Sequence, residues 1–129
     1  MNSSELQQRL KKFSLRLVPL CEVLQVKKIS KIIVDQLLRS DFSAAANYQA
    51  ACNAQSKKTF NAKLNIALEE IDETCFRLEI IHESELVKVE KLTLLLNEAR
   101  QPTKILGALL RTAINYQLTI KNYNNEVLY

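Results

Sequence analysis

Glycine and proline are almost missing from this chain of 129 residues, which contains one Gly and two Pro. β-sandwiches, barrels and Rossmann folds need Gly, Pro and Asn-Gly turns where their strands connect. Gly107 stands alone, and the sequence has no Asn-Gly pair, no Asp-Gly pair and no Gly-rich loop. The apolar share of 47% and the charged share of 25% are typical of a folded globular chain. The composition therefore predicts one all-α domain of ordinary size.

Long hydrophobic runs are also missing. No stretch approaches the roughly 18 apolar residues that a membrane span requires, and the first 13 residues lack the apolar segment of a signal peptide. The cysteines, Cys21, Cys52 and Cys75, are odd in number and far apart, which disfavours a disulfide framework and fits a reducing compartment. We therefore expect a soluble, cytoplasmic protein with no membrane association.

Signatures of enzymes and metal sites are absent as well. The sequence has no G-x-x-x-x-G-K-[ST] phosphate loop and no G-x-S-x-G nucleophile elbow. His82 is the only histidine, and Glu79 to His82 is the only E-x-x-H spacing, whereas a di-metal bundle needs this motif on two helices. We predict no catalytic residues, no metal ligands and no cofactor. The acids Glu69, Glu70 and Glu73 are instead expected to pair with Lys or Arg of a neighbouring helix.

Apolar residues recur at helical spacing in the first half of the chain. Ser3 or Ser4 can cap a first helix, in which the apolar positions are Leu6, Leu10, Phe13, Leu17, Leu20 and Leu24. Pro19 lies within this pattern and predicts a kink or a break. Residues 25–30 form the expected connection. A second helix is predicted over residues 31–54, with one face formed by Ile33, Leu37, Ser40, Ala44, Asn47 and Ala51.

The strongest helical pattern follows Ser56, a natural N-cap. Apolar positions then alternate at spacings of four and three, which is a heptad seam formed by Phe60, Leu64, Ala67, Ile71, Thr74, Leu78 and Ile81. A short turn at His82 and Glu83 and a cap at Ser84 are expected to start a fourth helix. Its predicted face consists of Leu86, Val89, Thr93, Leu96, Ala99, Leu106, Leu110 and Ala113. Pro102 marks a kink or a restart in this helix.

These four segments predict an antiparallel up-down four-helix bundle over residues 1–121, followed by a loose tail at 122–129. The fourth helix has more apolar surface than one seam can use, because Leu92 and residues 94–96 point around most of its circumference. A helix that is apolar on two sides is usually buried on two sides. We therefore expect the chain to form a homo-oligomer.

Positive charge is concentrated in the first half of the chain. Residues 1–63 hold eleven Lys and Arg against four acids, a net charge of +7, whereas residues 64–129 hold seven against ten, a net charge of −3. A basic half can meet phosphate, an anionic membrane or the acidic surface of another protein. It can equally meet the acidic stretch from Glu69 to Glu90 of a neighbouring subunit. The candidate phosphate contacts are Lys27, Lys28, Lys31, Arg39, Lys57, Lys58 and Lys63. Lys57 and Lys58 are the best of these, because the first turn of a helix favours anions.

Several strings of the sequence resemble the family of four-helix-bundle proteins known as 23S rRNA intervening sequence proteins. The likeness extends to Phe13, Leu17, Val18 and Leu24 in the first helix. The matching strings are Q-L-L-R-S at 36–40, S-A-A-A-N at 43–47, A-Q-S-K-K-T-F at 54–60, L-N-I-A-L-E-E-I-D-E-T at 64–74 and L-E-I-I at 78–81. Within them, the residues expected to have structural roles are Gln36, Arg39, Ser43, Asn47, Ser56 and Phe60.

The resemblance implies a ring-shaped homopentamer of four-helix bundles with no established enzymatic activity. Some members of the family are encoded inside insertions in 23S rRNA genes, and more distant relatives accompany reverse transcriptases and are thought to handle nucleic acid. The chain departs from the family where Ala50 stands in place of a common Glu and Arg77 in place of a frequent aromatic residue. Asp41 and Phe42 also replace a frequent Gly-Thr pair.

Three functions remain in competition at this point. The first is a non-catalytic oligomeric scaffold that binds nucleic acid through basic helix faces, with RNA preferred over DNA. No aromatic RNA-recognition motif is present, so we expect this scaffold not to read base sequence. The second is a scaffold that docks a partner protein through apolar surface and has no nucleic-acid role. The third, an enzyme, would need a polar cluster in a cleft, which the sequence does not supply.

Overall fold

The computed structural model describes residues 2–27, 29–85, 90, 92–101, 104–105, 108 and 112. Three helices are complete within these ranges: α1 (Ser3–Val26), α2 (Lys31–Cys52) and α3 (Lys57–Glu83). Residues 92–101 are also helical and form the longest described part of a fourth helix. No strand occurs in the described ranges, so the protein is all-α with four helices, as predicted. The predicted tail at 122–129 lies outside the described residues.

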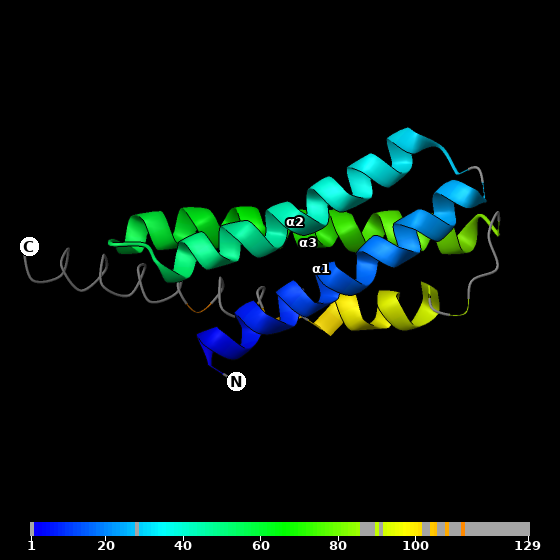
Figure 1. Cartoon of the computed structure of the whole chain (residues 1–129). Helices are drawn as coiled ribbons and strands as arrows, with labels where there is room; N and C mark the ends of the chain where they lie inside the picture. The colour runs from blue at the N-terminus through cyan, green and yellow to red at the C-terminus, as the bar shows by residue number, and fades with distance from the viewer. Residues whose placement is uncertain are drawn as a thin grey trace, which may run out of the picture.

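Helix α2 packs against both α1 and α3, and segment 92–101 runs beside α1 (Figure 1). Ion pairs join that segment to two helices, because Arg16 of α1 pairs with Glu98 and Glu79 of α3 pairs with Arg100. Helices α1 and α3, which are both fully described, do not approach each other closely. They therefore occupy diagonal corners of the bundle, with α2 and segment 92–101 at the other two.

Polar side chains define where α1 and α3 begin. The Asn2 side chain, and not Ser3 or Ser4, caps α1 by accepting from the Glu5 amide at 2.9 Å, while the Glu5 carboxylate accepts from the Asn2 amide. This reciprocal pair is a capping box, which Asn forms as well as Ser does. The predicted cap at Ser56 is confirmed, since its hydroxyl accepts from the Thr59 amide at 3.1 Å.

Helix α1 is continuous through Pro19, so of the kink or break predicted there the break is absent. Proline removes the backbone donor to the carbonyl four residues earlier, which belongs to Leu15. Leu15 and Pro19 both lie on the exposed side of α1, where solvent can satisfy that carbonyl. The connection to α2 falls at residues 27–30, inside the range predicted from the sequence.

Helix α3 is longer than its sequence suggested. His82 and Glu83 are part of its last turn and not of a connecting turn, and Ser84 is its C-cap, with its hydroxyl donating to the Ile81 carbonyl at 2.8 Å. Glu85 follows with φ 55, the left-handed conformation that ends many helices and usually belongs to glycine. The start of the fourth helix, where Ser84 was expected to act as N-cap, lies outside the described residues.

The predicted seam of α3 is confirmed almost residue for residue. All of its positions from Leu64 to Ile81 are buried, and Phe60 is half-buried. On α2 the buried face is rotated from the prediction: Ile33 is exposed and Asn47 half-buried, and the buried residues are Val34, Leu37, Ser40, Asp41, Ala44, Tyr48 and Ala51. The reason is that α2 lies between α1 and α3, so its buried face is wider than one seam.

The described part of the fourth helix buries a different face from the predicted one. Thr93 is exposed, and the buried residues are Leu92, Leu95, Leu96 and Ala99. Leu94 points away from this face and is 62% exposed. Three of the four leucines that suggested a second buried side are therefore covered within the chain. The predicted positions Leu86, Val89, Leu106, Leu110 and Ala113 lie outside the residues whose side chains are described.

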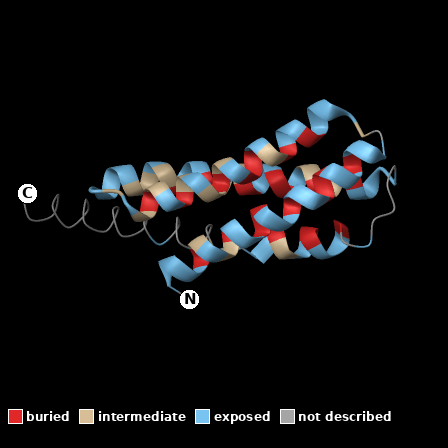
Figure 2. Cartoon of the chain, viewed as in Figure 1, coloured by how far each residue is buried: buried red, intermediate tan, exposed pale blue. Residues whose placement is uncertain are grey.

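Buried residues line the inner sides of the helices (Figure 2) and form two hydrophobic clusters. One cluster contains Leu17, Leu24, Val34 and Leu78 among others, and the second contains Leu6, Leu10, Ala51, Leu64 and Ile71 among others. Four buried polar residues lie near the boundary between the clusters: Ser14, Ser40, Asp41 and Thr74. A layer of polar side chains, which we call the polar layer, thus divides the core.

Candidate nucleic-acid interface

Three of the seven candidate phosphate contacts lie where α3 begins. Lys57 and Lys58 are exposed in its first turn, next to the capping Ser56, and Lys63 is half-buried further along. No acidic residue occurs in this first turn. The amide groups of a helix N-terminus carry a positive partial charge, so this end of the bundle favours an anion.

Two further candidates lie at the opposite end of α2. Lys27 follows α1 and Lys31 opens α2, and both are exposed. Helix α2 has 22 residues, which at 1.5 Å per residue separates its ends by about 33 Å. The structure therefore divides the basic residues into two groups at the two ends of α2. Lys28 lies outside the described residues.

Arg39 lies between these ends and is held by acids of α3. Its guanidinium lies 3.3 Å from the carboxylate of Glu70 and 3.3 Å from that of Glu73, and it also donates to the Gln36 side chain at 2.9 Å. Arg77 shares Glu73 at 3.3 Å. The expectation that acids of α3 pair with a neighbouring helix is confirmed for Glu70 and Glu73, whereas Glu69 accepts from Asn65 of its own helix. Because Arg39 already has two carboxylate partners, a phosphate would have to compete with them.

The remaining residues that carry the family resemblance have local structural contacts. The Asn47 side chain donates to the carbonyl and hydroxyl of Ser43, at 2.9 and 3.1 Å. Ser56 caps α3, and Phe60 packs against the cluster that contains Leu6 and Leu64. Ser56 therefore stabilises a helix end and Phe60 the helix packing, whereas Ser43 and Asn47 contact each other within α2.

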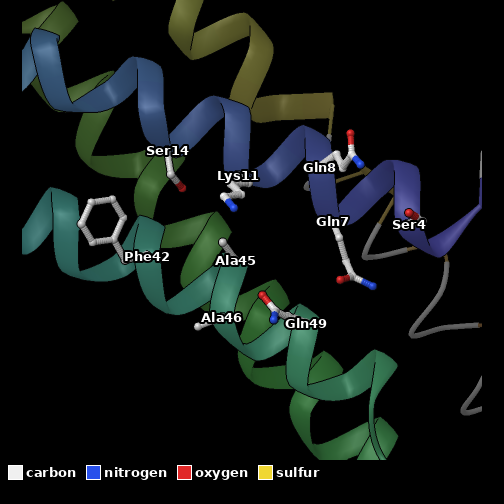
Figure 3. A pocket seen from close by; sticks show the side chains of 9 residues that line it. All are labelled: Ser4, Gln7, Gln8, Lys11, Ser14, Phe42, Ala45, Ala46 and Gln49. Carbon is white, nitrogen blue, oxygen red and sulfur yellow. The ribbon is translucent and has the colours of Figure 1, made fainter.

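A groove of about 500 Å³ separates the first half of α1 from α2. Its lining is polar apart from Phe42 and two alanines, and it contains Ser4, Gln7, Gln8, Lys11, Ser14, Phe42, Ala45, Ala46 and Gln49 (Figure 3). In the close-up, Ser14 extends from α1 toward α2, and Ala45 projects from α2 into the space between the helices. The sequence analysis did not identify this groove, because its residues come from two helices and share no motif.

Asp41 is the most unusual polar residue of the core. It is 1% exposed, and neither of its carboxylate oxygens has a hydrogen-bond partner among the described residues. Burial raises the pKa of Asp41 to about 6, although the nearby Ser14 hydroxyl limits this rise. That hydroxyl donates to the Leu10 carbonyl at 3.1 Å. An ionised carboxylate without a partner is costly in a protein interior, so Asp41 destabilises the fold at neutral pH.

The cysteines and the histidine show no arrangement for catalysis. Cys21 and Cys75 are buried and Cys52 is half-buried, and none of the three forms a disulfide. Burial, together with the nearby Asp41, raises the pKa of the Cys21 thiol to about 12, which makes it a poor nucleophile. His82 is exposed and lies 3.2 Å from the Thr93 hydroxyl. Within the described ranges, no three His, Cys, Asp or Glu side chains are grouped so as to hold a metal ion.

Comparison with known proteins identifies one matching family and a solved structure that is similar to this chain. The family model described as 23S rRNA-intervening sequence protein matches residues 2–108. A solved protein of unknown function from the S23 ribosomal protein family of Bacteroides thetaiotaomicron is 31% identical, with a TM-score of 0.78. The match covers 86% of this chain and 99% of that one. No curated protein matches the chain. None of the described helices combines the length and the apolar character that crossing a membrane requires.

Proposed function

Because the chain belongs to the 23S rRNA-intervening sequence protein family, we propose that it is a non-catalytic cytoplasmic scaffold that binds RNA through phosphate contacts. Neither the family description nor the solved relative assigns a reaction. The recognition is electrostatic and does not read base sequence. The start of α3 is the main contact, and the start of α2 is the second.

The observation that carries this proposal is the charge at the helix starts. Acidic side chains are favourable in the first turn of a helix, and cationic ones are favourable in the last. Helix α1 follows this rule with Glu5, but α2 begins with Lys31 and α3 with Lys57 and Lys58, and neither has an acid in its first turn. Lysines in a first turn oppose the helix dipole, and an RNA phosphate bound at that turn attracts both the lysines and the helix N-terminus.

Assembly multiplies these contacts in the proposed scaffold. The bundle is antiparallel with up-down topology, which fits the short connections at residues 27–30 and 53–56. The chain forms a homo-oligomer, a pentamer by its resemblance to the family. The exposed large apolar residues Leu15, Phe76 and Leu94, each at least 60% exposed, support an association surface. A ring repeats the same basic helix starts in every subunit.

The test replaces Lys57 and Lys58 together by Glu and measures RNA binding as a function of salt concentration. Each phosphate contact to a single strand contributes about 0.7 to the slope of log affinity against log salt. The variant should bind every RNA more weakly, and its slope should be smaller by about 1.4 for each subunit that contacts the strand. Unrelated RNA and DNA sequences are compared at low and physiological salt.

Two control variants separate the site from general charge. Changing Lys57 and Lys58 to Arg keeps the charge and should keep both affinity and slope. Changing the exposed Lys104 to Glu alters the net charge outside the first turn of α3, and it should weaken binding much less. The proposal is wrong if the wild-type protein binds no nucleic acid at low salt. It is also wrong if Lys104→Glu weakens binding as much as the double variant does.

A scaffold that docks a partner protein is the second candidate, and the exposed Leu15, Phe76 and Leu94 favour it. Apolar docking survives high salt, whereas phosphate contacts do not. Retention of a partner protein at high salt, combined with no affinity for RNA at low salt, would make this second candidate the better interpretation.

A further inference from the structure

An apolar pocket lies at the end of the bundle where α3 begins, and we call it the Phe60 pocket. Its volume is about 300 Å³. The start of α1, the end of α2, the start of α3 and the helical residues 104–105 all contribute to it. Its walls are formed by Leu6, Tyr48, Cys52, Phe60 and Ile105. Two exposed polar residues, Asn2 and Ser3, complete the lining.

The lining of this pocket suits one flat, apolar ring system. Phe60 is half-buried and Tyr48 is buried, and both aromatic side chains line the pocket. Sites for small molecules have volumes of about 300–1,000 Å³, so the Phe60 pocket is at the lower end of this range and has room for a single ring system. Nucleobases stack on aromatic side chains in proteins that bind single strands.

Lysines flank Phe60 on the surface of α3. Lys57 lies three residues before it and Lys63 three residues after it, a spacing that makes both of them neighbours of Phe60 on the helix. The first turn of α3 contains no acid. Glu5, which is close to the pocket along the chain, lines a different hollow together with Arg9. The pocket therefore suits an apolar ring that is attached to an anion.

A nucleotide of RNA combines these two parts. Lys57 and Phe60 are about 4.5 Å apart along the helix axis, at 1.5 Å per residue, so a base in the pocket places its own phosphate beside the start of α3. A base in a duplex is paired and stacked, and it must leave the helix before it can enter a pocket. The bases of a single strand are already accessible.

We propose that the Phe60 pocket holds one base of a single-stranded RNA whose phosphate is bound at the start of α3. This inference rests on the RNA binding proposed above and identifies the form of RNA that binds. The base stacks on the ring of Phe60, and Lys57 and Lys63 attract the backbone on either side. Because stacking tolerates every base type, the pocket distinguishes single strands from duplexes and not one base from another.

The first test compares two single strands of equal length that differ only in their bases. One is an ordinary RNA, and the other is an abasic strand with the same sugars and phosphates. Loss of base stacking lowers affinity by a factor of about 5 to 150. The ordinary strand should therefore bind the wild-type protein more tightly than the abasic strand by a factor in this range.

Two matched variants identify the stacking residue. Phe60→Leu keeps apolar bulk in the pocket but removes the ring, so it should bring the affinity ratio of the two strands close to one. The salt dependence of binding should be unchanged, because the lysines are intact. Phe42 is 46% exposed on α2 and does not line this pocket, so Phe42→Leu is the control and should keep the wild-type ratio. Circular dichroism verifies that both variants are folded.

The second test needs no variant, because the thiol of Cys52 reports on the pocket in the wild-type protein. Cys52 lines the pocket and is half-buried, whereas Cys21 and Cys75 are buried. A saturating ordinary strand should prevent most of the alkylation of Cys52 by iodoacetamide, as measured by mass spectrometry. A saturating abasic strand or a saturating RNA duplex should leave the rate near that of the free protein.

Four results would overturn the inference. If the ordinary and abasic strands bind the wild type equally well, no base is held. If Phe60→Leu keeps the wild-type affinity ratio, the base does not stack on Phe60. If Cys52 is alkylated equally fast with either strand bound, the base lies outside the pocket. In these three cases RNA binding through phosphate contacts survives. If no RNA binds even at low salt, the proposed function is wrong and this inference is wrong with it.

Discussion

Replacing Asp41 by Asn should make the stability of the protein less dependent on pH. Asp41 is buried and its carboxylate oxygens have no hydrogen-bond partner among the described residues. Burial raises its pKa from 3.8 to about 6. Between these two values the folded chain holds a proton that the unfolded chain has released. Raising the pH across this window therefore lowers the free energy of unfolding.

The size of the effect follows from the pKa. Each pKa unit corresponds to about 1.4 kcal/mol, so ionised Asp41 should cost the fold about 3 kcal/mol above pH 7. Below about pH 4 the carboxyl becomes protonated in the unfolded state as well as in the folded state, and this cost disappears. The amide of Asn is neutral at every pH. The stability advantage of Asp41→Asn over the wild type should thus grow by about 3 kcal/mol from below pH 4 to above pH 7.

Urea unfolding at a series of pH values and at a fixed protein concentration measures this difference. Other carboxylates titrate in the same window, but they do so equally in both proteins and cancel in the comparison. Parallel stability curves for the wild type and Asp41→Asn would refute the reasoning.

Two further changes test the packing and the helix end. Leu64 is fully buried in the α3 seam, and replacing it by Ala should lower the free energy of unfolding by about 2–5 kcal/mol. Glu73 belongs to an exposed ion pair, and Glu73→Ala should lower the free energy of unfolding by about 1 kcal/mol or less. Urea titrations compare the two, and equal losses would contradict the assigned core face. Glu85→Gly should raise the midpoint of thermal unfolding, because glycine adopts the positive φ of this position with less strain, and a lower midpoint would show that the Glu85 side chain stabilises the turn.

The sequence predicted the elements whose signals are local. The seam from Leu64 to Ile81 repeats every seven residues, and Ser56 stands where a cap belongs, so the start and the buried face of α3 follow from its sequence alone. The end of α3 does not, because the residue in the left-handed conformation is Glu85 and not the glycine that usually marks such a stop. Of the kink or break predicted at Pro19, the break is absent. The periodicity does not reveal that solvent reaches this side of α1, where it can satisfy the carbonyl that proline leaves unpaired.

The candidate site was harder to predict than the fold. The sequence groups basic residues by their position in the chain, but α2 separates Lys31 from Lys57 by its whole length, and Arg39 is held by two acids. In the sequence, Asp41 stands out only as a departure from the family pattern. Its burial depends on how α2 lies between two other helices, and no single-helix periodicity contains that information.

The polar layer also has a consequence for motion within the native state. Because Ser40, Thr74 and their neighbours interrupt the apolar core between the two clusters, we expect the clusters to open as separate cooperative units. Fluctuations at one end can expose one cluster to solvent while the other stays closed. Lys57 and Lys58 lie beside the cluster that contains Leu64, and Lys31 lies beside the cluster that contains Val34. Each basic end of the bundle therefore lies beside a different cluster. We expect a ligand bound at one end to stabilise the cluster next to it, while the other cluster can still open locally.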